Sequence, residues 1–255
     1  MNIYESFVIA FSMYSRIPMP KVEWSERGMK YAMCFFPLVG LVLGLCMYAS
    51  YVFLSWISVA ALTKAVVLTA LPIILTGGIH LDGYIDTSDA LQSWQASEKK
   101  LEILKDPHVG AFGVIRAILY FVITLGIMGE MNQNMLAVYI GGLFLSRTLS
   151  GLSVVCFKCA KNSGLAATFA DGAAKKRVRL IFCLYLVLAF LYLSGVGKIS
   201  GCLLFLCAFI TFGYYKWMSQ KQFGGITGDL AGYFLCICEM FFGIVLVISK
   251  YVGWI

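Results

Sequence analysis

Residues 31–55 read YAMCFFPLVGLVLGLCMYASYVFLS, a run of 25 residues without a charged side chain. A helix of about 20 apolar residues crosses the hydrocarbon core of a bilayer, which is about 30 Å thick. The run also lacks the alternation of apolar and polar residues that a membrane β-strand requires. It therefore predicts a transmembrane helix and sets the class of the fold.

Six more segments of this kind follow along the 255-residue chain, in which 60% of the residues are hydrophobic and 13% are charged. Such a composition is unlike that of a soluble domain. We predict an all-α, polytopic integral membrane helical bundle that forms one membrane-embedded domain over residues 1–255. The segments expected to span the membrane are Tyr31–Ser55, Val59–Leu75, Ala111–Met128, Met135–Val155, Val178–Ser194, Ile199–Trp217 and Leu230–Ile248.

The first residues do not resemble a cleaved signal peptide, because Glu5 stands where basic residues are expected. Residues 2–14 instead predict an amphipathic helix that lies in the membrane interface. Packing of the same apolar face against the bundle is an equally good interpretation. That face consists of Ile3, Phe7, Ala10, Phe11 and Tyr14.

The net charge of +7 follows from topology rather than from nucleic-acid binding. Sixteen of the 20 Lys and Arg residues lie in or beside the N-terminal arm and the even-numbered loops between the predicted spans. The positive-inside rule places these segments in the cytoplasm. The same residues are suited to attract an anionic substrate or anionic lipid headgroups.

The aspartates give a second signal, because all six fall in the segments assigned to the cytoplasm. Carboxylates contribute little to membrane topology, so this one-sided distribution needs another cause. A single reaction centre built from several cytoplasmic loops would supply one. The six residues are Asp82, Asp86, Asp89, Asp106, Asp171 and Asp229.

Residues 76–90, TGGIHLDGYIDTSDA, contain half of these aspartates directly after an apolar span. If the segment is helical, the spacings of four and three residues place Asp82, Asp86 and Asp89 on one face. No Lys or Arg lies between Lys64 and Lys99 to relieve their repulsion. A solvated acidic face is the alternative, but carboxylates beside a span and without basic partners favour a hard cation such as Mg²⁺.

Residues around this segment complete a candidate site for metal and phosphate. Gly77 and Gly78 give the backbone the freedom to let a phosphate approach closely. His80 is a candidate base, metal ligand or hydrogen-bond donor, and a structural histidine is an equally good interpretation. Farther along the chain, Lys105 follows in the same loop, and residues 224–229, GGITGD, repeat the glycine-rich pattern with Thr227 and Asp229.

These motifs, in this order, resemble the cobalamin synthase family, whose members are adenosylcobinamide-GDP ribazoletransferases. The resemblance rests on residues 76–91, on 105–106 with 110–113, and on 224–229, and it is supported by residues 17–20 (IPMP) and 35–40 (FFPLVG). It covers almost the whole chain, and the order and spacing of the motifs make it specific.

The resemblance implies a Mg²⁺-dependent phosphotransferase in the cytoplasmic (inner) membrane, with its active site facing the cytoplasm. It implies transfer of adenosylcobinamide phosphate from adenosylcobinamide-GDP to α-ribazole or α-ribazole 5′-phosphate. The products are GMP and adenosylcobalamin or its 5′-phosphate, formed in the last steps of cobalamin biosynthesis. Whether the chain forms a homo-oligomer is left open.

Each residue of the candidate site receives an expected role. The residues expected to be catalytic are His80, Asp82, Asp86 and Lys105, and those expected to bind the phosphate-bearing ligand are Gly77, Gly78 and Thr227. The residues expected to bind Mg²⁺ are Asp82, Asp86, Asp89 and Asp229.

Three other functions use similar residues. CDP-alcohol phosphotransferases and membrane prenyltransferases also hold Mg²⁺ with spaced aspartates, but the motifs typical of each are absent from this segment. A divalent-cation transporter would need ligands along a path through the bilayer. Glu239 is the only carboxylate inside a predicted span, which argues against transport.

Overall fold

The structure is a computed structural model that describes residues 3–161 and 164–255. In these ranges the chain forms ten helices and no extended strand. The helices are α1 (Ile3–Tyr14), α2 (Glu26–Trp56), α3 (Ala61–Thr76), α4 (Ile79–Gln92), α5 (Ser97–Ile103), α6 (Ala111–Glu130), α7 (Gln133–Cys156), α8 (Leu165–Gly172), α9 (Lys175–Phe223) and α10 (Gly228–Tyr251).

Six of the seven predicted spans lie wholly within a helix, and Val59–Leu75 begins two residues before α3. Five helices, α2, α6, α7, α9 and α10, are each long and apolar enough to cross a membrane, and the pair α3 and α4 passes the same test only together. The two members of this pair meet at a bend of 94°. We assign the crossing to the apolar α3 and place α4 beyond it, because α4 carries three carboxylates that hydrocarbon would exclude.

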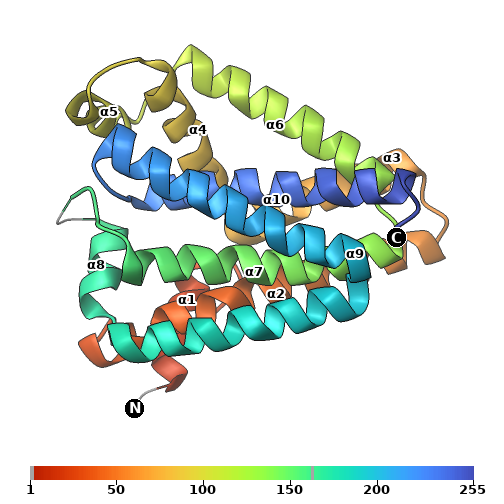
Figure 1. Cartoon of the computed structure of the whole chain (residues 1–255), viewed down its shortest axis with the longest axis horizontal. Coiled ribbons are helices and arrows are strands. Elements are labelled where there is room, and N and C mark those ends of the chain that lie inside the picture. Colours follow the sequence, from red (N-terminus) through yellow and green to blue (C-terminus); the bar gives the residue numbers. More distant parts are fainter. Residues whose placement is uncertain (1–2, 162–163) are drawn as a thin grey trace.

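Helix α9 is a hairpin of two apolar arms rather than one rod of 49 residues. The chain reverses at Lys198, whose φ of 47° and ψ of −122° are not helical. As a result the rings of Phe190 and Phe205, one on each arm, lie only 5.1 Å apart. With two arms in α9, the number of crossings is odd, and the chain ends lie at opposite ends of the bundle (Figure 1).

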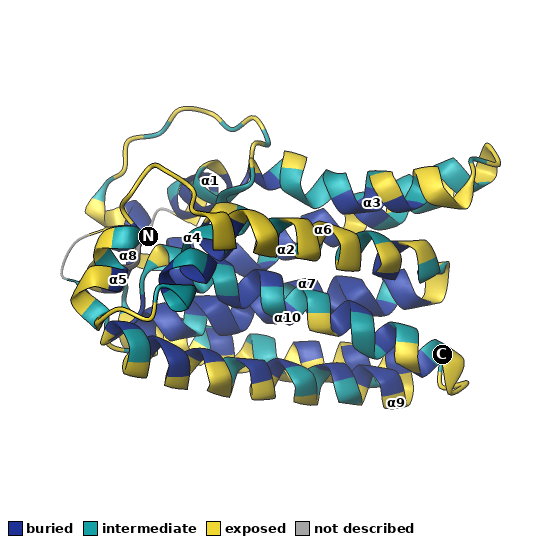
Figure 2. Ribbon diagram, turned by 90° about the horizontal axis from the view of Figure 1, so that it is seen from above, coloured by how far each residue is buried: buried dark blue, intermediate teal, exposed yellow. Residues whose placement is uncertain are grey.

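Burial separates the core of the bundle from its lipid-facing surface. Helix α7 is buried along almost its whole length and packs against α2, α9 and α10. Helices α6 and α9 instead expose most of their apolar side chains on the outside (Figure 2). An exterior of this kind is stable only against hydrocarbon, so the burial pattern agrees with a multi-pass membrane protein.

Helix α1 packs along α2. Ile9 and Phe11 are buried, the ring of Phe7 meets that of Phe35 edge to face at 5.7 Å, and Ser6 donates a hydrogen bond to the carbonyl of Gly28. The second interpretation of residues 2–14, packing against the bundle, thus describes this face of α1. Ile3, which belongs to the same apolar face, and Tyr4 are exposed in the first turn, so an interfacial position of the helix stays a prediction.

The polar elements gather at one end of the bundle, the end that also holds the N-terminus (Figures 1 and 2). Helices α4, α5 and α8 lie there, together with the loop that begins α10. The far end holds the start of α3, the reversal of α9 and the C-terminus. The segments that carry the aspartates therefore meet at one boundary of the membrane.

Candidate functional site

The site begins at the bend between α3 and α4. Gly77 ends α3 and Gly78 begins α4, with φ of 65° and 78°. Two consecutive left-handed residues are readily adopted only by glycine, which explains the Gly-Gly pair at this position. The bend turns the chain out of the membrane direction, so that α4 carries Asp82, Asp86 and Asp89 along the polar end of the bundle.

Helix α4 meets the start of α10 at a very short distance. A Cβ atom on Gly83 would lie 2.7 Å from the Cα atom of Asp229, and one on Gly232 would lie 2.8 Å from the carbonyl oxygen of His80. Glycine at these two positions allows the two backbones to touch. The structure thereby brings Asp229 beside Asp82, although 147 positions separate them in the sequence.

The carboxylates of this cluster repel one another. Burial, followed by the charges of Asp82, Asp229 and Asp89, raises the pKa of Asp86 from 3.8 to about 6. Burial and the charge of Asp82 also raise the pKa of Asp229, while hydrogen bonds and Lys161 act in the opposite direction. The pKa values of both carboxylates are raised on balance, so their charged forms are destabilised in the folded protein, which is the electrostatic condition for binding a cation.

Asp89 has a different place from the other aspartates of α4. Its two carboxylate oxygens accept hydrogen bonds from the backbone N–H groups of Gly110, at 2.7 Å, and Gly113, at 2.8 Å. These N–H groups begin α6, where a carboxylate compensates the helix dipole. Asp89 thus holds α6 against α4, and both of its oxygens are already engaged.

His80 faces the interior of the bundle. Its ring lies 6.2 Å from that of Tyr14 and 5.8 Å from that of Phe36, and its buried Nε2 atom has no hydrogen-bond partner among the residues that the structure describes. Burial and the positive charge of Arg147 lower the pKa of His80 to about 3, so the imidazole is neutral. Together with Asp82, Asp229 and Ser150, it lines an enclosed cavity of about 210 Å³.

A second, larger hollow lies on the other side of Asp82. This groove has a volume of about 680 Å³ and runs between the N-terminal arm and the bend of α3 and α4. Gly77, Gly78, Asp82 and Arg16 line it. Asp82 therefore stands between an open groove and an enclosed cavity, which is a suitable position for a group that must meet two substrates.

The donor set fits a metal ion that its substrate completes. Within the two described ranges, no three His, Cys, Asp or Glu side chains are grouped so that they could hold a metal ion by themselves. Mg²⁺ usually binds one or two carboxylates together with substrate phosphates and water. Asp82 and Asp86, with Asp229 opposite them, supply the carboxylates for such a site, whereas Asp89 would have to give up its bonds to α6.

Comparison with known proteins identifies the family. The model of the cobalamin-5-phosphate synthase family matches residues 6–247. The chain belongs to the cobalamin-5-phosphate synthase family. An adenosylcobinamide-GDP ribazoletransferase of Lachnoclostridium phytofermentans is 43% identical over 250 residues, which cover 98% of this chain and 96% of that protein.

Other relatives of the chain are also named adenosylcobinamide-GDP ribazoletransferase. One from Clostridium perfringens is 35% identical, with 95% of this chain and 97% of the relative covered, and one from Desulfitobacterium hafniense is 32% identical, with 92% and 93% covered. No solved structure matches the chain. The family membership confirms the resemblance seen in the sequence and decides against the three alternative functions.

Lys161 lies at the candidate site, although the sequence did not indicate it. A parallel bridge joins Cys159 to Ile226, and a Cβ atom on Gly225 would lie 2.5 Å from the backbone nitrogen of Ala160. This contact carries Lys161 to the α10 start, where its charge acts on Asp229. Burial and the neighbouring charge of Lys105 lower the pKa of Lys161, so the two lysines form a basic pair beside the carboxylates.

Thr227, expected to bind the ligand, serves as the N-cap of α10. Its hydroxyl accepts a hydrogen bond from the backbone N–H of Leu230 at 3.2 Å. This bond satisfies one free donor of the first turn and fixes the point where the helix begins. Thr227 therefore positions Asp229, two residues later, whatever it contributes to ligand binding.

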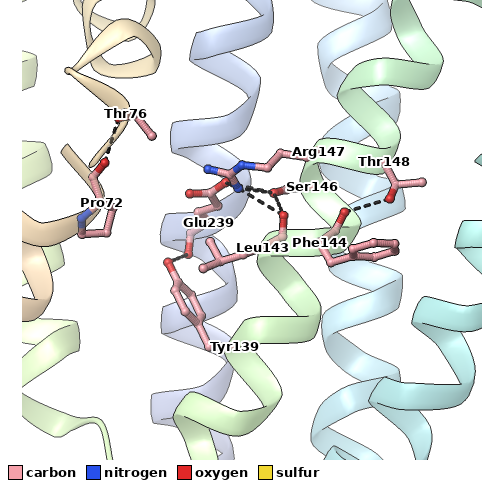
Figure 3. A network of polar contacts seen from close by, with 9 residues as sticks. All are labelled: Pro72, Thr76, Tyr139, Leu143, Phe144, Ser146, Arg147, Thr148 and Glu239. Carbon is pink, nitrogen blue, oxygen red and sulfur yellow. Dashed lines mark hydrogen bonds and ion pairs between the residues drawn. The ribbon is translucent and has the colours of Figure 1, made fainter. Parts of the chain in front are cut away.

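A buried ion pair lies deeper in the bundle, between α7 and α10 (Figure 3). Arg147, with 2% of its side chain exposed, donates hydrogen bonds to Glu239, Ser146 and the carbonyl of Leu143. The Glu239 carboxylate also accepts from Ser146. The carboxylate inside the membrane is thus neutralised by a fixed arginine, which suits a structural role better than cation transport.

Proposed function

We propose that this chain transfers adenosylcobinamide phosphate from adenosylcobinamide-GDP to α-ribazole or α-ribazole 5′-phosphate, with release of GMP. The reaction yields adenosylcobalamin or its 5′-phosphate. The substrates follow from the names of the relatives, and the family membership makes the chain a transferase. Dependence on Mg²⁺ and a position in the cytoplasmic membrane, with the active site facing the cytoplasm, are parts of the proposal.

One observation carries the proposal to particular residues. The contact between Gly83 and the backbone of Asp229 joins two carboxylate-bearing segments at a place where two hollows meet. Uncompensated carboxylates beside a pair of lysines suit a diphosphate with a divalent cation. This arrangement supports a phosphotransfer reaction more directly than the aspartates in α4 do alone.

Different residues of the site would bind the metal ion and the phosphate groups. Asp82 and Asp86 would hold Mg²⁺ from α4, and Asp229 would hold it from α10. When bound, the ion supplies positive charge at the diphosphate and at the leaving GMP. Lys105 and Lys161 bind phosphate oxygens and keep the reacting groups in place.

A ribose hydroxyl of the ribazole loses its proton as it attacks the cobinamide-linked phosphorus. We assign this proton to a carboxylate of the cluster rather than to His80. The imidazole is enclosed between Tyr14 and Phe36, and an imidazolium cation formed there would be desolvated. His80 instead shapes the enclosed cavity beside Asp82.

The test is an assay of the purified protein in liposomes with adenosylcobinamide-GDP, α-ribazole and Mg²⁺. We expect stoichiometric release of GMP and formation of adenosylcobalamin, and we expect both to stop when a chelator removes the divalent cation. Failure of the protein to form GMP, together with consumption of a CDP-alcohol or an isoprenoid diphosphate, would contradict the proposed function. Activity that survives the chelator would contradict the metal requirement alone.

A further inference from the structure

The side chain of Arg16 lines the open groove, and no acidic residue that the structure describes forms an ion pair with it. It belongs to the N-terminal arm between α1 and α2, and it lines the groove together with Asp82, Gly77 and Gly78. In the part of the chain that the structure describes, the guanidinium takes part in no hydrogen bond or ion pair. An arginine that shares a groove with a carboxylate but does not pair with it is available to a ligand.

The backbone fixes Arg16 at this place. Its N–H donates a hydrogen bond of 2.7 Å to the carbonyl of Leu75 in the last turn of α3. The Ser15 hydroxyl, which accepts from the N–H of Ile17, donates to the carbonyl of Phe11 and so closes the end of α1. The residue is therefore tied to both helices that border the groove, although it lies in a loop.

Gly77 makes room for the side chain. A Cβ atom on Gly77 would collide with Nε of Arg16 and would also lie 3.0 Å from its Cγ atom. The absence of a side chain on Gly77 leaves room for the Arg16 side chain beside the bend. Gly77 thus serves the site in two ways. It adopts the left-handed backbone of the bend, and it leaves room for the Arg16 side chain at the wall of the groove.

The charges of the site indicate which ligand the Arg16 guanidinium would bind. Under the proposed function the divalent cation is shared between the carboxylates of the acidic cluster and the two negative charges of the substrate diphosphate, so the ion alone does not neutralise the loaded site. A guanidinium offers five N–H donors in a planar fork that matches phosphate oxygens. Because Arg16 and Asp82 line the same groove, the guanidinium can contact a diphosphate whose cation is held by that carboxylate.

We propose that Arg16 binds the diphosphate of the nucleotide-activated substrate in this groove, an inference that rests on the proposed function. In the transfer, a ribose hydroxyl oxygen forms a bond to the cobinamide-linked phosphorus. The bond from this phosphorus to the bridging oxygen breaks, and GMP leaves with that oxygen and its electron pair. The hydroxyl proton passes to a carboxylate, and Arg16 balances the negative charge on the departing phosphate.

The experiment compares Arg16→Gln and Arg16→Lys with Arg27→Gln. Arg27 is a suitable control because it is exposed near the same arm but does not line the groove. For Arg16→Gln we expect the KM for adenosylcobinamide-GDP and the inhibition constant of GMP to rise by about tenfold, the effect of losing one charge-assisted contact. The KM for α-ribazole should stay unchanged, and Arg16→Lys should recover part of the loss.

Two results would overturn the proposal. One is an Arg16→Gln enzyme whose KM for adenosylcobinamide-GDP and GMP inhibition match those of Arg27→Gln. The other is an equal loss for both substrates with a lower melting temperature, which would make Arg16 a purely structural residue. Because both results require an active wild-type enzyme, they differ from failure of the proposed function, in which the wild type itself releases no GMP.

Discussion

Replacing Glu239 by Gln tests how the buried ion pair holds the bundle together. The substitution keeps the size of the side chain and one hydrogen-bond acceptor for Arg147, but it removes the negative charge. Arg147 would remain 98% buried, with only the Ser146 hydroxyl and the Leu143 carbonyl as fixed polar partners besides the new amide. Its charge would then be uncompensated in the interior of the bundle.

The structure sets the size of the effect. Removing one partner of a buried ion pair costs about 3–5 kcal/mol, because the remaining charge stays desolvated. The lower end applies here, since Glu239 keeps 14% exposure and the amide still accepts one hydrogen bond. A loss of about 3 kcal/mol corresponds to a fall of about 6–12 °C in melting temperature for a chain of this size.

The assay is thermal unfolding of the purified protein in a mild detergent, followed by tryptophan fluorescence. Glu130→Gln is the matched control, because the ion pair of Glu130 with Lys250 is 40% and 35% exposed and water solvates whichever partner remains. We expect little or no change for this control. The double substitution Arg147→Met with Glu239→Leu should recover most of the stability, because it removes both buried charges.

Two outcomes would refute this reasoning. If Glu239→Gln melts within about 2 °C of the wild type, as expected of an exposed pair, then the buried charge is not held by Glu239. If the double substitution melts no higher than Glu239→Gln alone, the loss comes from packing between α7 and α10 rather than from an unpaired charge.

Three further predictions concern the site. Asp82→Asn should abolish GMP release without lowering the melting temperature or the amount of protein in the membrane fraction; near-normal activity would remove Asp82 from the proposed metal site. The raised pKa of Asp86, about 6, means that the folded protein binds a proton between about pH 4 and 6 that the unfolded chain has lost. Without divalent cations the melting temperature should therefore rise as the pH is lowered through this range, Mg²⁺ at pH above 7 should produce a similar rise, and Asp86→Asn should remove most of both effects. Gly225→Ala should reduce turnover by pushing the segment before Lys161 away from the α10 start, whereas Gly213→Ala, whose new methyl group meets open space in α9, should not; equal activities of the two would show that the close contact at Gly225 does not position the site.

The sequence alone determined the class of the fold and the approximate limits of every span. Six of the seven predicted segments lie within a helix and Val59–Leu75 begins two residues before α3, because hydrocarbon selects for local apolar length, a property of consecutive residues. The placement of Asp82, Asp86 and Asp89 on one face depended on residues 82–90 being helical, and α4 contains all three. The family could also be inferred at this stage, since its motifs are local.

The tertiary structure decided which of these residues meet. It brings Asp229 to Asp82 through Gly83, and it carries Lys161 to the same place through the contact at Gly225. It turns Asp89, which has the same helical spacing as the others, to the start of α6. Composition and periodicity indicate only which residues of a segment face lipid and which face the protein. The contacts of the site depend instead on how closely two backbones approach and on which charges remain unpaired.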